Sequence, residues 1–276
     1  MPEPLRSPMP ESHPLPPFHG LMAVDVKDST RLPSREHAQL SRALTEIVHQ
    51  GLELAGLKEM PREFENHSGD GLAFGFDPSW VPHVISPFAD VLNTLLQEHN
   101  AGPGPHLRLR MSLHIGPVPR SPGLPGDGNA APRSETHRLL DSVPAREWLA
   151  RADADATPLV LIVSDTVYRR VVVDGYCALP AARFAEVHAE VAGKDFAQTA
   201  WIYVPSPSGD LLTGSDAADV PDHEEAVGKT AEPAPAAPRQ GGTRLQFVES
   251  GVAVMDSTMG DFHHHTESRH SPDRNS

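Results

Sequence analysis

The sequence predicts an α/β fold of the α+β type, in which a ferredoxin-like βαββαβ core is extended by further strands and helices. Two observations indicate this core. Apolar strand patterns and amphipathic helix patterns follow one another in that order from residue 18, and a strictly alternating strand at 107–115 comes after the second helix. Of the 276 residues 38% are hydrophobic, which is enough for one substantial core. We therefore expect a single domain flanked by tails.

The first two elements place a carboxylate at the end of a strand. Residues 20–26, GLMAVDV, have the apolar run of a buried strand, and Asp25 interrupts it near its end. A helix is expected from its N-cap, Ser34, to about Leu57, because apolar residues recur there with the 3.6-residue period. Asp25 therefore lies where the chain leaves the strand for the helix.

The next elements place a second carboxylate on a turn. Residues 62–67 and 71–76 predict two short strands, and the segment between them has the glycines of a tight hairpin. Asp70 is expected at the tip of this hairpin. In a split βαβ sheet the end of the first strand and this tip are neighbours, so the two aspartates are expected to lie together.

The remaining elements complete the sheet and its covering helices. In chain order we expect a helix from Pro82 or Pro87 to Glu98, a strand at 107–115, a helical segment from Ser134 to Leu149, a buried strand at 158–163, a helix capped by Ser164 and Asp165, and a strand pair at 184–191 and 200–204. A loop that holds Gly193 and Lys194 joins the last two strands.

Composition separates this domain, residues 18–205, from two tails. Residues 1–17 are rich in Pro, Ser and Glu, and residues 206–276 are rich in Pro, Ala, Gly and acidic side chains. Such segments bury too little apolar surface to offset chain entropy, so both are expected to be disordered. A short apolar patch within 245–262 has the character of a segment that adds a strand to another chain, so an effector is a candidate partner of the second tail.

Charge and cysteine content exclude several classes of function. The formal charge of -14 repels a nucleic-acid backbone, and no basic stripe offsets it. The single cysteine, Cys177, cannot form an internal disulfide, which is typical of a reducing compartment. The N-terminus has no apolar signal region, and no run of eighteen apolar residues occurs, so we expect a cytoplasmic protein that spans no membrane.

The two aspartates have the chemistry of a magnesium site. Carboxylate oxygens without His or Cys suit Mg²⁺, which prefers oxygen ligands and keeps substrate phosphates and water around it. Ser29 and Thr30 follow at the strand-to-helix turn, where backbone N–H groups are available to phosphate oxygens. Asp25 or Asp70 alone is equally well explained as a turn cap. Together they predict a metal site that binds substrate phosphates.

Three motifs around these residues resemble those of class III nucleotidyl cyclase catalytic domains. AVDVKDST, SGDGLAFGF and RMSLHIGPV occur in the family's order and spacing, and the resemblance covers roughly residues 18–205. It implies that family's fold and the conversion of a nucleoside triphosphate to a 3′,5′-cyclic nucleotide and pyrophosphate for intracellular signalling. It also implies that Asp25, Asp70 and the Val26 carbonyl bind two Mg²⁺ or Mn²⁺ ions, which activate the ribose 3′-hydroxyl and neutralise the pyrophosphate.

The resemblance further assigns residues to the sugar and the phosphates. The segment SETHRLLD is similar to a helix motif of the family. Arg138 matches the arginine that stabilises charge on the phosphate, and Ser134 stands in place of the asparagine that positions the ribose. Lys194 matches a lysine that reaches the substrate phosphates. Active sites of this family form between two chains, so a homodimer is implied.

Two further positions differ from the family or are loosely matched. Asn66 stands where adenylate cyclases have a base-selecting lysine, so adenine is not implied, and an amide can read the edge of several bases. Asp127 is the candidate for the second base-reading residue. Asp28 replaces a glycine and adds a negative charge beside the triphosphate, which Lys27 partly offsets.

Other interpretations remain open beside the enzyme. The departures at Asn66, Ser134 and Asp28 also fit a catalytically inactive cyclase-homology module that binds nucleotide or dimerises. Asp25, Asp70 and Arg138 favour catalysis instead. A third interpretation makes the domain an adaptor that recruits an effector through its tail. A diguanylate-type cyclase or a polymerase palm is less well supported, because the sequence has neither a GGDEF run nor a basic nucleic-acid channel.

Overall fold

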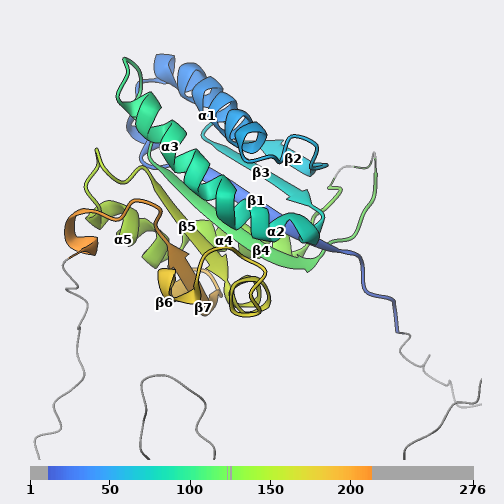
Figure 1. The fold of residues 1–276 in the computed structure, drawn as a ribbon. Coiled ribbons are helices and arrows are strands. Elements are labelled where there is room, and N and C mark those ends of the chain that lie inside the picture. Colours follow the sequence, from blue (N-terminus) through green and yellow to red (C-terminus); the bar gives the residue numbers. More distant parts are fainter. Residues whose placement is uncertain (1–11, 123, 125, 213–276) are drawn as a thin grey trace, which may run out of the picture. The chain divides into compact units, whose positions relative to one another are not determined.

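A seven-stranded sheet organises the protein in the computed structural model, which describes residues 12–122, 124 and 126–212 (Figure 1). The strands are β1 (Phe18–Val26), β2 (Glu63–His67), β3 (Gly71–Phe76), β4 (Leu109–Pro117), β5 (Leu159–Ser164), β6 (Ala185–Glu190) and β7 (Ala197–Tyr203). Their spatial order is β2-β3-β1-β4-β5-β7-β6. Strands β4 and β5 run parallel, and the other pairs of neighbours are antiparallel. Strand β1 therefore lies between the β2–β3 hairpin and β4.

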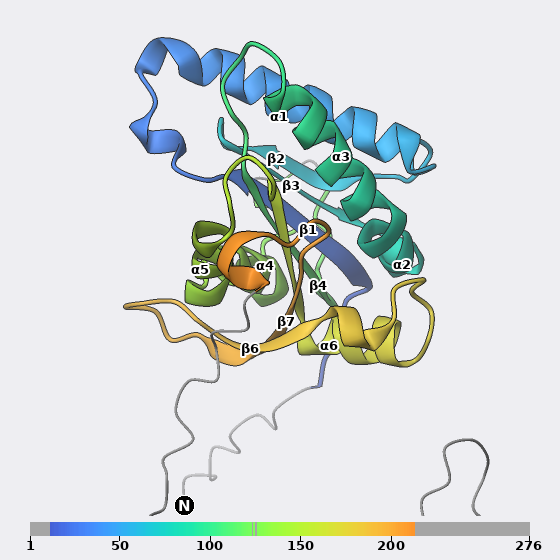
Figure 2. The same cartoon turned by 60° about the vertical axis from the view of Figure 1, so that its left-hand side comes forward.

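Helices cover both faces of the sheet. The α-helices are α1 (Ser34–Leu54), α2 (Val81–His83), α3 (Ala89–Asn100), α4 (Ala131–Asp141), α5 (Val143–Arg151) and α6 (Asp165–Val167). Short 3-10 segments lie at Ser29–Arg31, Pro78–Trp80, Ala181–Arg183 and Gly209–Leu211, and π-helical segments at Val84–Phe88 and Tyr168–Val173. Figures 1 and 2 show α1 and α3 together on one face of the sheet and α4 and α5 on the other.

Side chains of β1 alternate between the two faces of the sheet and pack into an apolar cluster on each face. Met22 and Val24 belong to the large apolar cluster under α1 and α3, whereas Ala23 packs with Leu140 of α4 on the opposite face. Apolar neighbours on both faces explain the continuous apolar run of this strand. Asp25 shares the α4 face with Ala23, because side chains two residues apart in a strand point the same way.

The predicted α+β fold with its split βαβ core is confirmed, and the largest local difference concerns the helical segment expected from Ser134 to Leu149. It is two helices, α4 and α5, separated by Ser142 in an extended conformation. Pro144 has no N–H to continue the hydrogen-bond ladder of α4, and its fixed φ suits the first turn of α5. The break matters because it directs α5 back toward the end of β1.

Two other helices differ at their ends. The first ends at Leu54, three residues before the predicted Leu57. The helix expected from Pro82 or Pro87 is interrupted at Ser86, which is extended with φ of -150° inside the π-helical segment, and continues as α3 from Ala89. A residue before proline is pushed out of the α region, which accounts for the interruption.

Contacts with the domain continue past residue 205, where the sequence predicted the second tail to begin. Thr157 Oγ1 donates a hydrogen bond of 2.5 Å to the Ser206 carbonyl, and the Asp153 N–H donates one of 3.1 Å to Ser208 Oγ. The packed segment therefore includes residues that composition had assigned to the tail.

At the other end the packing begins just before β1. The Pro17 carbonyl accepts a hydrogen bond of 2.9 Å from the Val118 N–H, which extends the β1–β4 pairing by one residue. Predictions about residues 1–11 and about the apolar patch within 245–262 fall outside the described residues. In the described part of the chain, no helix has the length and apolar character needed to cross a membrane.

A buried arginine ties β4 to α5 and β5. Arg108 is 8% exposed, and its guanidinium donates four hydrogen bonds of 2.7 to 3.2 Å to the carbonyls of Leu149, Ala152 and Thr157. Two of these carbonyls lie at the C-terminal end of α5, where carbonyls have no partner within the helix. Arg108 thus fixes the end of α5, the helix that forms one wall of the cavity beside Asp25.

We expect Arg108→Met to lower the free energy of unfolding by about 2–4 kcal/mol, because the three carbonyls lose a charged donor inside the protein. Urea denaturation followed by circular dichroism measures the change. Arg170→Met is the matched control, since the Arg170 side chain is 76% exposed. A loss for Arg108→Met no larger than that of the control would contradict the structural role.

Candidate functional site

The ladder of the sheet brings the two predicted aspartates together. Asp25 pairs with Gly71 of β3 on one side and with Arg110 of β4 on the other. The next residue, Val26, donates its N–H to the Asp70 carbonyl at 2.9 Å. Because the N–H and C=O of a strand residue point toward the same neighbour, the Val26 carbonyl also faces the hairpin. Asp70 is therefore held beside the end of β1.

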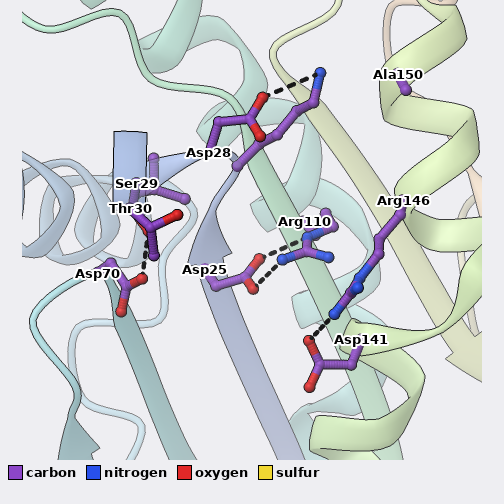
Figure 3. Close-up of a pocket in the computed structure, with 11 residues that line it drawn as sticks. Asp25, Asp28, Ser29, Thr30, Asp70, Arg110, Asp141, Arg146 and Ala150 are labelled. Carbon is purple, nitrogen blue, oxygen red and sulfur yellow. Dashed lines mark hydrogen bonds and ion pairs between the residues drawn. The ribbon is translucent and has the colours of Figure 1, made fainter. Parts of the chain in front are cut away.

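A cavity of about 490 Å³ opens at this point (Figure 3). Its lining residues come from the end of β1, the following turn, the hairpin, β4 and the α4–α5 corner: Asp25, Val26, Lys27, Asp28, Ser29, Thr30, Asp70, Arg110, Asp141, Arg146 and Ala150. Both predicted metal aspartates thus border one cavity, together with the turn residues predicted to approach phosphates.

Asp25 is engaged by an arginine across the ladder. Arg110 Nε donates to Asp25 Oδ1 at 2.9 Å, and Nη2 donates to Oδ2, so that the guanidinium holds both carboxylate oxygens. The side chains are only 12% and 20% exposed, respectively. Burial raises the pKa of the Asp25 carboxyl to about 6, an effect that outweighs the opposing attraction of Arg110. Asp141 and Asp70 raise this pKa further by charge repulsion.

Asp70 is oriented by the turn that follows β1. The buried Ser29 hydroxyl donates to Asp70 Oδ2 at 2.5 Å, and the Ser68 hydroxyl lies 3.5 Å from Oδ1. The Ser29 side chain therefore positions Asp70, a role that the sequence did not predict. Asp28 has φ of 59°, in the left-handed region that glycine adopts without strain, which explains why a glycine suits this position.

A second cavity of about 150 Å³ adjoins the first. Asp25, Asp70 and Asp141 line both cavities, and the second is also bordered by Asn66 of β2 and His137 of α4. Asn66, the candidate base-reading residue, is therefore brought next to the aspartate pair. Burial lowers the pKa of His137, so this ring favours its neutral form.

Asn66 faces this cavity because β2 contains a bulge. Glu63 pairs with Gly75 and Asn66 pairs with Ala73, so β2 has one residue more than β3 between these pairs. Residues three apart in a regular strand point to opposite faces, whereas here both lie on the α4 side. Phe64, in the bulge, has φ of 54°, a rare conformation for a bulky side chain.

Contacts from several segments stabilise the Phe64 conformation. Arg133 Nη2 donates to the Phe64 carbonyl at 3.1 Å. The ring lies 5.3 Å from the His19 ring and 5.8 Å from the Arg120 guanidinium carbon. Gly128 packs so closely that a Cβ there would lie 2.4 Å from the ring. Phe64 is thus held by the loop that precedes α4 and by α4 itself, the helix that borders the second cavity.

Four predicted residues lie outside both cavities of this chain. Ser134 is exposed on α4, and Arg138 Nη1 donates to the Asp195 carbonyl at 3.4 Å. Lys194 precedes Asp195 in the β6–β7 loop, so the loop that carries Lys194 lies against Arg138. Asp127 accepts a hydrogen bond of 2.5 Å from the Ser121 N–H within its own loop. The roles that the resemblance gives these residues remain predictions.

Three charged residues that line the larger cavity were not predicted from the sequence. Arg110 alternates with the apolar residues of β4, and antiparallel pairing of β1 with β4 places it opposite Asp25. Asp141 and Arg146 gave no local signal, because the break between α4 and α5 brings them to the cavity. Arg146 Nη2 donates to Asp141 Oδ1 at 2.8 Å.

The donors at this site fit a hard divalent cation. The Asp25 and Asp70 carboxylates and the Val26 carbonyl supply oxygen atoms, the ligands that Mg²⁺ and Mn²⁺ prefer. Within the described ranges, no group of three or more His, Cys, Asp or Glu side chains is placed to hold a metal by itself. Such an ion would therefore need substrate oxygens and water to complete its coordination.

Several solved structures of nucleotidyl cyclases are similar to the chain. The guanylyl cyclase Cya2 is 13% identical, with a TM-score of 0.46, over 70% of this chain and 93% of that one. A bacterial light-regulated adenylyl cyclase gives 14% and 0.48, over 71% and 55%. The adenylate/guanylate cyclase/hydrolase from Silicibacter pomeroyi gives 16% and 0.45, over 68% and 97%. No protein-family model and no curated protein sequence matches.

At 13–16% identity and TM-scores of 0.45 to 0.48, these similarities carry no argument about this chain. The chemistry of the site rests on this chain's own residues.

In the metal-free protein we expect the Asp25 carboxyl to titrate with a pKa of about 6, and Arg110→Gln to raise that pKa. Removal of the guanidinium leaves burial and the neighbouring carboxylates, which all favour the protonated form. Carbon-detected NMR titration of the aspartate carboxyl groups measures both values, with Asp25→Asn to assign the signal. A pKa near 4 in the wild type, or a lower pKa in Arg110→Gln, would contradict this.

Proposed function

We propose that the chain is a nucleotidyl cyclase, which converts a nucleoside triphosphate to a 3′,5′-cyclic nucleotide and pyrophosphate. The observation that carries the proposal is that Asp25 and Asp70 meet at the wall shared by two adjoining cavities. The larger one has a volume within the range of small-molecule sites and is lined by cationic side chains, which suits phosphates. The smaller one, with Asn66, suits the base.

The charge of the larger cavity predicts a requirement for divalent cations. Four carboxylates and three cationic side chains line it: Asp25, Asp28, Asp70 and Asp141, with Lys27, Arg110 and Arg146. Its net charge of -1 repels a polyphosphate unless cations enter with it. Metal-dependent binding of the triphosphate follows from this balance.

Asp25, Asp70 and the Val26 carbonyl would hold two divalent ions. When bound, these ions lower the pKa of the ribose 3′-hydroxyl and neutralise the leaving pyrophosphate. Ser29 keeps one Asp70 oxygen oriented, while the other has only the long 3.5 Å contact with the Ser68 hydroxyl. Arg110 must release at least one Asp25 oxygen, and its guanidinium is then free to bind phosphate oxygens.

A homodimer would complete the site. Arg138 and Lys194 lie together outside the cavities of their own chain, as expected for groups that act on a partner's substrate. Closed two-fold dimers are the commonest oligomers, and one dimer would contain two equivalent sites. Each site would combine the aspartates of one chain with the cationic group of the other.

A nucleotide-binding module without turnover is the second candidate, because Arg110 occupies both oxygens of Asp25. If the arginine keeps this position when nucleotide binds, Asp25 is not available to a metal ion. Ser134 also has a shorter side chain than the asparagine that it replaces. An assay of product formation beside nucleotide binding separates the two candidates.

The full chain is expected to form a cyclic nucleotide from at least one of ATP, GTP, CTP and UTP with Mg²⁺ or Mn²⁺, as detected by mass spectrometry. Asp70→Asn should reduce the rate by at least about 100-fold, because even groups that only orient a metal ligand contribute about 10–100-fold. Asp174→Asn is the matched control on the exposed turn after the Tyr168–Val173 segment, and it should retain full activity.

Nucleotide binding by the wild type without any cyclic product would contradict the proposed cyclase activity and support the nucleotide-binding module. Equal activity of Asp70→Asn and Asp174→Asn would show that catalysis does not require Asp70.

The two-chain site predicts recovery of activity on mixing. Asp70→Asn and Arg138→Gln should each be inactive alone, and their mixture should regain up to about a quarter of wild-type activity, since half of the dimers are mixed and each holds one intact site. A mixture of Asp70→Asn with Asp25→Asn is the control. Each of these variants lacks one metal-binding aspartate, so no dimer that they form contains an intact site. Recovery in the control, or none in the test mixture despite subunit exchange, would contradict the proposed arrangement.

A further inference from the structure

Helix α5 brings an arginine to the wall of the larger cavity that lies opposite β1. Arg146 lies in the first half of α5, which starts anew after the break at Ser142. Its side chain is 58% exposed and extends toward Asp141 at the end of α4, with a distance of 2.8 Å between Nη2 and Oδ1. Figure 3 shows the Arg146 guanidinium near Asp141, with the Asp25–Arg110 pair beside them.

The three cationic side chains of this cavity are all paired with carboxylates. Lys27 Nζ lies 3.8 Å from Asp28, and Arg110 holds Asp25. The Arg110 pair is mostly buried, with side chains 12% and 20% exposed, whereas the Asp141 side chain is 36% exposed. The Arg146 pair is therefore more open to solvent than the Arg110 pair and can exchange partners with less loss.

We propose that Arg146 binds the triphosphate of the substrate, and that Asp141 holds it in place beforehand and competes with the phosphates for it. This inference rests on the proposed function, and it names an arginine of the same chain that neither the motifs nor the resemblance assigned. A guanidinium has a fork of donors that matches two phosphate oxygens, so one arginine can exchange a carboxylate for a phosphate without leaving the wall.

The position of Asp141 explains why its pairing with Arg146 matters before substrate binds. Asp141 lines both cavities, and it raises the pKa of Asp25 by charge repulsion. With Arg146 beside it, much of the Asp141 charge is neutralised before substrate enters. Even with a divalent ion bound, the phosphates carry more negative charge than one carboxylate, so they attract the guanidinium more strongly than Asp141 does.

The test is equilibrium binding of inorganic triphosphate with Mn²⁺ to the full chain, measured by calorimetry at low and moderate salt. Inorganic triphosphate makes the result independent of the base. Arg146→Gln should weaken binding by at least about tenfold, as expected for loss of a charged hydrogen bond. Arg146→Lys should recover part of the affinity. Arg170→Gln, which removes an exposed arginine paired with Asp174 at 4.0 Å, should leave the affinity unchanged.

Asp141→Asn supplies a test of opposite sign. It removes the competing carboxylate and keeps the size of the side chain, so triphosphate should bind several-fold more tightly, with a greater gain at low salt. Thermal unfolding of each variant confirms that the domain is intact.

The outcomes separate this inference from the function on which it rests. Arg146→Gln with the affinity of Arg170→Gln overturns the role of Arg146, and weaker binding by Asp141→Asn overturns the competition. Either result leaves the proposed cyclase standing if the wild type binds triphosphate and makes product. Failure of the wild type to bind triphosphate or any nucleoside triphosphate with Mn²⁺ overturns both.

Discussion

The pairing of β1 with a strand on each side is the constraint on which the site depends. It places Gly71 and Arg110 opposite Asp25, and the hydrogen bond from Val26 to the Asp70 carbonyl joins the hairpin to the same strand end. Gly71 must be small, because a Cβ there would lie 3.0 Å from the Val24 carbonyl oxygen. A shift of one residue in this register would move Asp25 to the face under α1 and α3, away from the cavity.

The strand pairing brings the carboxylates of Asp25 and Asp70 close together, and nearby cationic side chains partly offset their negative charge. Burial near Asp70 and Asp141 raises the pKa of Asp25, and Arg110 counters this rise without abolishing it. The arrangement is therefore incomplete electrostatically without added cations. If Asp25 held a divalent ion, Arg110 would be free to bind phosphate, so the metal and the triphosphate would bind cooperatively rather than independently.

The sequence predicted the residues whose signal is local and missed those that depend on tertiary structure. Asp25 and Asp70 stand out because Asp25 interrupts an apolar run near its end and Asp70 lies on a glycine-containing turn just before an apolar run, and both features are visible in the sequence alone. Arg146 and Asp141 enter the cavity only because the chain breaks between α4 and α5, and a long helical pattern concealed that break. Asn66 was predicted as a base-reading residue, but its orientation depends on a bulge that the residue pattern of β2 does not predict.

The distribution of cationic side chains gives binding and catalysis different requirements. Lys27, Arg110 and Arg146 belong to the same cavity as the aspartates, so one chain would supply both the metal ligands and the cationic groups for a triphosphate that enters with divalent ions. Arg138 and Lys194 lie elsewhere in that chain and would act only across a dimer interface. On these proposals an isolated chain binds substrate without cyclising it, and association adds the groups that stabilise the developing charge. The binding module and the enzyme are then two assembly states of one protein.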